Sequence, residues 1–364
     1  MAGIQDPETM PWWCWAAPVA AAALLAAKFS GAIPSTGALV LVPAALLLGG
    51  AVFAAVHHAE VIALRVGEPF GSIVLAAAVT VIEVALIVSI MLSAPDGAPA
   101  TARDTVFAAI MIVLNGIVGL CLLAGGMRHH EQGFRASGAT GALGVLGTLA
   151  TLVLILPNYT LTTPGPAYAP SQLVFVAIVS LALYGLFLFV QTVRHRSYFL
   201  EEGDGASPHA LPSGRAVARS AGLLLLALVG VILLAKTLSP AIDRAIDAAG
   251  LPDACVGIVI AGVVLLPEGL ASYRAAQANR LQTSLNLALG SSLATIGLTI
   301  PAVTIVSLAI GVPLVLGLQA GHIVLLVLSL FASTLTLAAG RSTVLQGGVH
   351  LVIFAAFLVI SAVP

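Results

Sequence analysis

Long apolar runs recur from one end of this chain to the other, and they constrain its fold more than any other feature. Each is of the length, about 20 residues, that a helix needs to cross the hydrocarbon core of a bilayer. Of 364 residues, only 8% are charged, whereas soluble domains carry about 25%. Too few charges remain to cover a water-exposed surface. The sequence therefore predicts an all-α polytopic membrane protein.

Eleven transmembrane helices are predicted, separated by connections rich in Pro, Gly and Asp. The predicted spans cover residues 12–28, 38–64, 70–93, 105–127, 138–156, 171–194, 217–237, 253–274, 282–309, 318–339 and 343–363. The first of them lies in a region at 1–37 that also holds the N-terminal end. Because eleven is an odd number, the two termini are expected on opposite sides of the membrane.

The arginine and lysine residues orient these spans, because cytoplasmic loops carry an excess of them. Ten of the fourteen lie on the side of the N-terminus: Arg65, Arg128, Arg135, Arg194, Arg196, Arg215, Arg219, Arg274, Arg280 and Arg341. The other four are Lys28, Arg103, Lys236 and Arg244. The N-terminus is therefore predicted to be cytoplasmic and the C-terminus external.

After the first helix, the spans divide into two sets of five. The sets cover 38–194 and 217–364, and a cytoplasmic acidic linker at 195–216 joins them. The second span of each set carries a lone carboxylate near its centre, Glu83 in one and Glu268 in the other. Five spans per set force the two sets into opposite orientations. Inverted repeats with a site near the midplane are typical of secondary transporters.

The two buried glutamates, Glu83 and Glu268, predict cation–proton exchange. Placing a carboxylate at the bilayer centre costs a few kcal/mol unless it pairs, binds a cation or takes up a proton. A pair of carboxylates can hold one Ca²⁺ ion, and repulsion between them favours protonation once that ion leaves. The alternative is a structural role, in which each glutamate is buried against a polar partner.

Neutral oxygen donors near these positions are candidates for supporting ligands or cavity lining. Pro267 removes a helical hydrogen bond just before Glu268 and is expected to free a carbonyl. Hydroxyls and amides suited to Ca²⁺ or Na⁺ lie on the motif spans and on the third span of each set. They are Thr80, Asn115, Asn286, Ser291, Ser292 and Thr295.

Several polar groups nearer the predicted membrane surface leave alternatives open. Glu60 and the pair His57 and His58 are candidates for a cytoplasmic vestibule; the alternatives are pairing of Glu60 with Arg65 and interfacial packing of the histidines. The stretch "RHHEQ" at 128–132 is expected to be a solvated loop. Aspartates on the opposite side, such as Asp104, either attract cations or are simply solvated. The acidic run at 201–204 is expected to be a solvated linker.

Four stretches resemble the bacterial ChaA-type calcium/sodium–proton antiporters of the cation/calcium exchanger superfamily. They are "HHAEVIALRVGEPFGSIVLAAAVTVIEVALIVSIML", "VLNGIVGLCLLAGGMRHHEQGF", "RHRSYFLEEGD" and "PEGLASYRAAQANRLQTSLNLALGSSLATIGLTIPA". The resemblance implies one helix plus two inverted five-helix repeats whose motifs meet at the membrane centre. It also implies that Glu83 and Glu268 bind the cation and protons, and that the chain lies in the bacterial inner membrane.

The chain departs from the superfamily pattern beside both glutamates. A Gly-Asn pair is expected to end three residues before each carboxylate, but the chain has Val79-Thr80 and Val264-Leu265. Serines expected on the first repeat's third helix are replaced by Met111 and Ile112. The amide ligands of both motif helices are therefore missing, which keeps the identity of the cation open.

The function predicted is export of Ca²⁺, and also Na⁺ or K⁺, in exchange for H⁺ by alternating access. A predominantly monovalent Na⁺/H⁺ or K⁺/H⁺ antiporter is the alternative. Two further classes, an intramembrane enzyme and a channel, are less favoured: no HExxH motif or mid-span aspartate is present, and a channel does not need two titratable carboxylates. No cofactor is expected; the partners are inorganic cations, protons and the lipid bilayer. A net charge of −1 gives no basic surface for nucleic acid.

Overall fold

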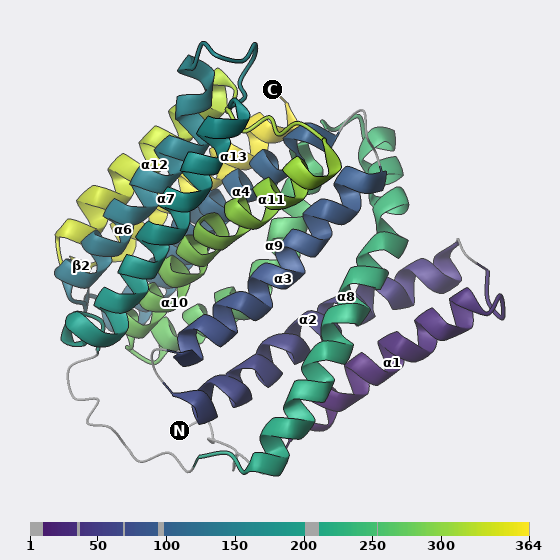
Figure 1. The fold of residues 1–364 in the computed structure, drawn as a ribbon. Helices are drawn as coiled ribbons and strands as arrows, with labels where there is room; N and C mark the ends of the chain where they lie inside the picture. The colour runs from purple at the N-terminus through teal and green to yellow at the C-terminus, as the bar shows by residue number, and fades with distance from the viewer. Residues whose placement is uncertain are drawn as a thin grey trace. The chain divides into compact units, whose positions relative to one another are not determined.

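A computed structural model describes residues 10–34, 37–67, 70–93, 98–200, 211–252 and 254–363 (Figure 1). It is almost entirely helical, and the described part of the chain contains 11 helices long and apolar enough to cross a membrane. The fold class predicted from the sequence is confirmed. The spans are Trp12–Phe29, Ala38–Val66, Phe70–Met91, Thr101–His129, Ala136–Tyr159, Pro170–Arg194, Gly214–Ala248, Ala254–Gln277, Leu281–Ile310, Ala320–Ala338 and Val344–Ala362.

The seventh span differs most from its predicted bounds. It forms α8 (Gly214–Ala248), a helix of 35 residues, although hydropathy places its end at residue 237. Charged residues end the apolar run but not the helix, and Arg244 Nε donates to the carbonyl of Pro240 at 2.8 Å within it. The helix ends at Ala248, and the turn that follows includes Gly250, whose φ of 66° favours glycine.

The third span of each five-helix set is interrupted at its middle by a wider turn. The first consists of α4 (Thr101–Met111), the π-helix η2 (Ile112–Ile117) and α5 (Val118–His129). The second consists of α10 (Leu281–Ala294), the π-helix η7 (Thr295–Thr299) and α11 (Ile300–Ile310). π-Helical turns are rare and occur frequently at functional sites.

Two other spans also end in irregular turns. One comprises α6 (Ala136–Ala150), η3 (Thr151–Ile155) and η4 (Leu156–Tyr159), and the other comprises α7 (Pro170–Phe189), η5 (Val190–Arg194) and η6 (Arg196–Tyr198). Between the two spans, the Tyr168 hydroxyl donates to the carbonyl of Leu152. Burial raises the pKa of Tyr168 to about 12, so this hydroxyl keeps its proton at neutral pH.

The described helices form two compact units. The first consists of the described residues of Met1–Ile90 and Gly205–Ala245. It contains α1 (Trp12–Phe29), α2 (Ala38–Val66), nearly all of α3 (Phe70–Ser93) and most of α8. Small residues let α1 and α2 pack closely: a Cβ on Gly50 would lie 3.1 Å from that of Ala17.

The second unit consists of the described residues of Met91–Asp204 and Ile246–Pro364. Besides the fourth to sixth spans (Thr101–His129, Ala136–Tyr159 and Pro170–Arg194) it contains α9 (Ala254–Gln277), α10 to α11, α12 (Ala320–Ala338) and α13 (Val344–Ala362). Each unit draws on both halves of the sequence, so the compact units differ from the predicted sequential repeats. The inverted repeats stay a prediction about the symmetry of the fold, and the two compact units do not test them.

Within the second unit the span Thr101–His129 is the most deeply buried of the eleven, with 72% of its most apolar stretch buried. It contacts α9 on one side and α13 on another. Gly257 of α9 lies against the backbone of Asp104 and Thr105, and Gly347 of α13 lies against Leu123. In both places a Cβ would collide with backbone atoms, so only glycine permits the approach.

A short antiparallel pair joins two of the connections in the second unit. Strands β1 (Gln132–Gly133) and β2 (Arg341–Ser342) pair with Gln132 opposite Ser342. Phe134 N donates to the carbonyl of Gly340 at 2.9 Å beside them. The pair fixes the ends of α5 and α12 to each other, next to the start of α13.

Candidate functional site

The first glutamate, Glu83, lies near the middle of α3 and is 2% exposed. Thr80 precedes it by three residues, so both side chains lie on the same face of the helix. Thr80 is also buried, and its hydroxyl makes no hydrogen bond within the described residues. A buried carboxylate and a buried hydroxyl therefore lie one turn apart.

The second glutamate, Glu268, lies in α9 directly after the buried Pro267. It is partly exposed, and its Oε2 atom is buried. Pro267 has no N–H, so the carbonyl of Val263, four residues earlier, loses its helical donor. Glu268 follows this carbonyl by five residues in the same helix, and the carbonyl's role as an ion ligand stays a prediction.

Gly269, the next residue of α9, is the point where this helix meets η2. A Cβ on Gly269 would lie 3.1 Å from the Cδ1 atom of Ile117. The π-helical turn of the third span is therefore packed against the residue adjacent to Glu268.

The hydroxyls predicted on the third span of the second half are buried where α10 passes into η7. Ser292 is fully buried and Thr295 is 2% exposed, and the hydroxyls of Ser291 and Ser292 make no hydrogen bond to any described group. Thr295 is the first residue of η7. Helix α10 packs on α9, which carries Glu268. Their role as ligands stays a prediction.

The two predicted amide ligands are both engaged elsewhere. Asn115, in η2, donates from Nδ2 to Ser329 Oγ at 2.9 Å, and its Oδ1 lies 3.1 Å from His350 Nδ1. Asn286 donates to the carbonyl of Phe199, and its Oδ1 accepts from Gln282 Nε2 at 2.9 Å. These contacts direct Asn115 toward α12 and α13, and Asn286 toward the segment after η6.

Asn286 also lies at a different level of its helix from Thr295. The two are nine residues apart, which is about 13 Å along a helix at 1.5 Å per residue. Gln282 extends the chain of contacts by accepting from Arg135 N at 2.6 Å. Asn286 therefore belongs to a polar network near the start of α10.

The vestibule residues of α2 occupy different environments. His58 is fully buried; its Nε2 lies 3.1 Å from the Cys14 carbonyl and its Nδ1 lies 3.3 Å from Ser220 Oγ. The His57 ring packs on Trp13, with centroids 5.8 Å apart. Both histidines therefore pack on other groups of the first unit, and their role in a vestibule stays a prediction.

Glu60 is exposed, and no ion pair joins it to Arg65 among the residues that the structure describes. The Arg65 guanidinium instead approaches the carbonyl of Pro212 at 3.5 Å. The suggested Glu60–Arg65 pairing is therefore absent, and the vestibule role of Glu60 stays a prediction.

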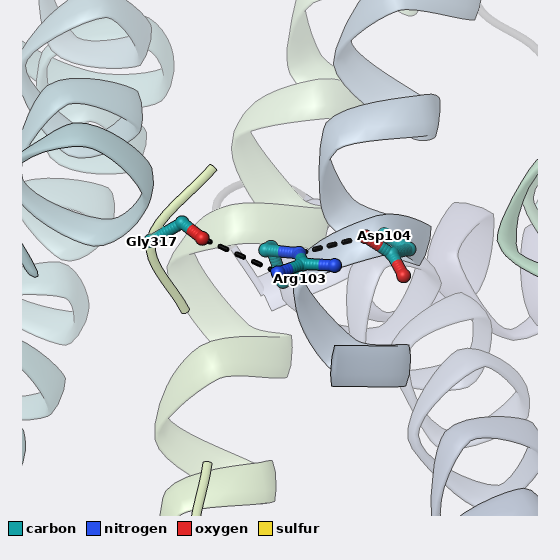
Figure 2. Close-up of polar contacts among 3 residues, drawn as sticks. All are labelled: Arg103, Asp104 and Gly317. Carbon is teal, nitrogen blue, oxygen red and sulfur yellow. Dashed lines mark hydrogen bonds and ion pairs between the residues drawn. The ribbon is translucent and has the colours of Figure 1, made fainter. Parts of the chain in front are cut away.

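At the start of α4, an ion pair occupies one of the aspartates predicted on the external side. Arg103 Nε donates to Asp104 Oδ1 at 2.7 Å, and Arg103 also donates to the carbonyl of Gly317 at 3.3 Å (Figure 2). The two side chains are 12% and 11% exposed, so Asp104 is neither freely solvated nor unpaired. Residues 201–204 of the acidic linker lie outside the described residues.

The prediction of a solvated loop at 128–132 is wrong for Gln132. This residue is 2% exposed, and its Nε2 donates to the Ala276 carbonyl and to Asn279 Oδ1, both at 2.9 Å. His129 lies 3.0 Å from the carbonyl of Gln277. His129 and Gln132 therefore form hydrogen bonds with residues at and just after the end of α9.

Buried polar residues of apolar spans were missed in the reading of the sequence. Ser272 lies one turn beyond Glu268, is fully buried and makes no hydrogen bond within the described ranges. His350 is fully buried in α13. A signal existed for His350, which is an isolated polar residue inside a membrane-length apolar run, as Glu83 is, but not for Ser272, because Tyr273 and Arg274 follow it directly.

Comparison with known proteins identifies the family. The model of the sodium/calcium exchanger protein family matches residues 36–193 and 219–363. This chain belongs to that family. The predicted inverted repeats at 38–194 and 217–364 stay a prediction.

Two curated relatives are similar over most of their length. The chain is 54% identical over 356 residues to the putative ionic transporter y4hA of Sinorhizobium fredii, covering 98% of this chain and 97% of the relative. It is 36% identical over 311 residues to the sodium-potassium/proton antiporter ChaA of Escherichia coli, covering 84% of each. The resemblance to ChaA-type antiporters is thereby confirmed.

A solved structure shares the fold. The selenium-substituted Ca²⁺/H⁺ antiporter protein YfkE aligns with a TM-score of 0.73 at 16% identity, covering 96% of this chain and 99% of that one. At 16% identity this similarity establishes the fold of the chain, but it does not identify the cation that the chain transports. The prediction of a membrane-embedded cation antiporter is confirmed at the level of the family.

Proposed function

We propose that this family member is a secondary antiporter that exports Ca²⁺ in exchange for H⁺ by alternating access. The observation that carries the proposal is the placement of one glutamate near the centre of the second span in each half, with Glu83 2% exposed on α3. An ionised carboxylate at such a position needs a cation or a proton. The transported cation is then cargo and not a resident cofactor.

Competition for the same oxygens couples the two fluxes. Ca²⁺ binding requires ionised carboxylates, whereas loss of the ion leaves negative charges whose burial and mutual repulsion favour protonation. A glutamate that has released Ca²⁺ therefore returns across the transport cycle carrying a proton. In this scheme Glu83 and Glu268 bind both substrates in turn, and Thr80, Pro267, Ser291, Ser292 and Thr295 supply neutral oxygens.

Orientation follows the distribution of basic residues. We propose that the chain lies in a bacterial inner membrane with its N-terminus in the cytoplasm and its C-terminus outside, because cytoplasmic loops are enriched in Arg and Lys. This orientation makes the β1–β2 pair cytoplasmic and the Arg103–Asp104 pair external. Cysteine accessibility of single-cysteine variants on each side would test it.

A predominantly monovalent antiporter is a second candidate, supported by a specific observation. The positions that would carry an amide three residues before each glutamate hold Thr80 and Leu265. The amide of Asn115 is occupied by Ser329 and His350. Fewer neutral ligands suit Na⁺ better than Ca²⁺, which takes six to eight oxygens. The curated relative ChaA, by its name, exchanges sodium and potassium for protons.

Everted membrane vesicles with an acid interior would test both candidates. A dye reports the pH gradient while Ca²⁺, Na⁺ or K⁺ is added separately to the parent, to Glu83→Gln and to Glu268→Gln. Collapse by Ca²⁺ that both variants lose supports Ca²⁺/H⁺ exchange. Collapse by Na⁺ or K⁺ alone establishes the monovalent candidate.

Glu131→Gln is the matched control, because Glu131 is a carboxylate outside the spans with 53% of its side chain exposed. It should behave as the parent. Full activity of both Glu83→Gln and Glu268→Gln would refute the proposed mechanism. Glu268→Asp, which keeps the charge but shortens the side chain, should retain part of the activity.

A further inference from the structure

Four buried polar side chains of the second unit form one continuous chain of hydrogen bonds. Thr336 Oγ1 lies 3.2 Å from His350 Nε2, and His350 Nδ1 lies 3.1 Å from Asn115 Oδ1. Asn115 Nδ2 donates to Ser329 Oγ at 2.9 Å, and Ser329 Oγ donates to the Leu325 carbonyl at 2.7 Å. The first three residues come from three different helices: α12, α13 and η2.

The chemistry of these groups fixes where each proton lies. Asn115 Oδ1 can only accept, so His350 Nδ1 carries the hydrogen between them. In a neutral imidazole Nε2 is then an acceptor, and it accepts a hydrogen bond from the Thr336 hydroxyl. Every donor in the chain has an acceptor, with His350 neutral. Because Asn115, His350 and Ser329 are all 0% exposed, water does not replace these partners.

This network anchors η2 on the side facing α12 and α13. Gly116, the next residue, also packs on α13, where a Cβ would lie 3.3 Å from two ring atoms of Phe354. π-Helical backbone is strained relative to α-helix and needs external contacts to persist. The Asn115 side chain supplies such contacts through His350 and Ser329.

The opposite side of η2 touches the glutamate helix. Ile117 packs on Gly269, the residue after Glu268, and α9 contacts both η2 and α5. A displacement of η2 would therefore move a side chain that packs on the residue next to Glu268. The path from His350 to this site is short: one hydrogen bond to Asn115, two residues of η2, and one van der Waals contact.

We infer that His350 is a positioning residue for cation exchange, which holds η2 against α9 beside Glu268 by donating a hydrogen bond to Asn115. The inference rests on the proposed role of Glu268 in binding the cation. His350 does not touch the cation; it sets the position of the helix turn that borders it. This role also explains the placement of Asn115: its amide is hydrogen-bonded to residues of α12 and α13, and other oxygens coordinate the cation.

Three substitutions of His350 separate its two nitrogens. His350→Asn places an amide N–H near the former Nδ1 and can still donate to Asn115. His350→Gln places its amide near the former Nε2, within reach of Thr336 but not suited to Asn115. His350→Leu removes both bonds. Thr336→Val cuts only the bond to Thr336, on the far side of the ring from Asn115.

The measurement is cation-dependent proton flux in purified, reconstituted protein, normalised to folded protein, with KM for the transported cation and the pH profile recorded for each variant. Loss of an outer partner of a binding site costs about tenfold in affinity or activity. We expect His350→Leu and His350→Gln to raise KM by about that factor and to shift the pH profile, and His350→Asn to restore most of it. Thr336→Val should change KM less than His350→Leu.

A purely structural role predicts something else: less folded protein, but an unchanged KM and pH profile per folded molecule. That result for His350→Leu, or equal behaviour of His350→Asn and His350→Gln, would overturn the inference. If His350→Leu is not recovered folded, the comparison of Asn with Gln carries the test alone. Glu268→Gln is measured beside them: its full activity refutes the proposed role of Glu268, whereas its loss of activity together with an unchanged His350→Leu refutes only the role of His350.

Discussion

Ile117 and Gly269 approach so closely that a methyl group on Gly269 would lie 3.1 Å from the Cδ1 atom of Ile117. One residue belongs to a π-helical turn, and the other directly follows Glu268. With that methyl group the contact would be tighter than ordinary van der Waals packing, but it would involve the far end of a flexible side chain. Position 269 therefore tolerates a methyl group, but only if the Ile117 side chain moves, next to Glu268.

The first prediction concerns this contact. Gly269→Ala should lower the maximal rate of cation–proton exchange by about tenfold, because misplacement of a binding group by a fraction of an ångström is costly, while thermal stability changes little. Gly262→Ala is the control on the same helix, since a Cβ there would meet nothing within 4 Å. Equal rates for the two variants in reconstituted vesicles would show that the contact does not matter for transport.

The second prediction concerns Gln132 and its hydrogen bonds to Ala276 and Asn279. A Cβ on Gly125 would collide with Gln132 Oε1, and Gln132 cannot retreat without breaking its bonds to Ala276 and Asn279. Gly125→Ala should therefore lower the free energy of unfolding by about 1–3 kcal/mol, the usual cost of overpacking. Gly141→Ala, in an open position of α6, should instead be neutral or slightly stabilising. Thermal melts of detergent-solubilised protein measure both.

The third prediction separates structural from ligand roles of Asn286. Asn286→Ala leaves the Phe199 carbonyl and the Gln282 amide without a partner, at a cost of about 1–3 kcal/mol in stability. KM for the cation should stay unchanged. Thr295→Ala provides the contrast, because a lost ligand should raise KM with little effect on stability. A raised KM for Asn286→Ala would restore the ligand role predicted from the sequence.

The fourth prediction compares two ion pairs that differ in exposure. Arg103→Gln removes a charge-assisted bond to Asp104 and the bond to Gly317, and should cost about 1–3 kcal/mol of stability. Arg341 and Glu131 form a longer pair, at 3.5 Å, with side chains 71% and 53% exposed. Arg341→Gln should therefore cost about 0–1 kcal/mol. A larger loss for Arg341→Gln than for Arg103→Gln, in chemical or thermal unfolding, would contradict this ranking.

The fifth prediction concerns alkaline pH. The pKa of Tyr168 is raised by burial from 10 to about 12, so its neutral form is favoured in the folded protein. The resulting stability is present below pH 10 and is lost as pH rises through about 12. Tyr168→Phe should be less stable than the parent at pH 8, since it lacks the bond to Leu152, and the difference should shrink above pH 10. A constant difference between pH 8 and 11.5 would contradict the assignment.

The eleven spans could be predicted from the sequence because each must be apolar over the thickness of a bilayer, whatever its neighbours are. The end of α8 could not, because hydropathy reports where apolar residues stop, and α8 continues through Asp243 and Arg244. The π-helical turns could not be predicted either. η2 depends on contacts of Asn115 with residues 214 and 235 positions away in the sequence.

The glutamates stood out in the sequence because a charge inside a membrane span is costly and calls for a functional explanation. Amides carry no such signal. Asn115 and Asn286 have the same side chain in similar helices, yet one is bonded to His350 and Ser329 and the other to Phe199 and Gln282. Which partner an amide finds is decided by tertiary packing, so its role could not be assigned from its position alone.

The length of α8 has a consequence for its surroundings. A helix of 35 residues is about 52 Å long, while the hydrocarbon core is about 30 Å thick. Tilts of up to about 40° leave more than a full turn of such a helix beyond the core. The part of α8 that extends beyond the core therefore lies among the lipid headgroups of one leaflet and bears Asp243, Arg244 and Asp247. A change in headgroup charge or bilayer thickness then acts on the tilt of this helix.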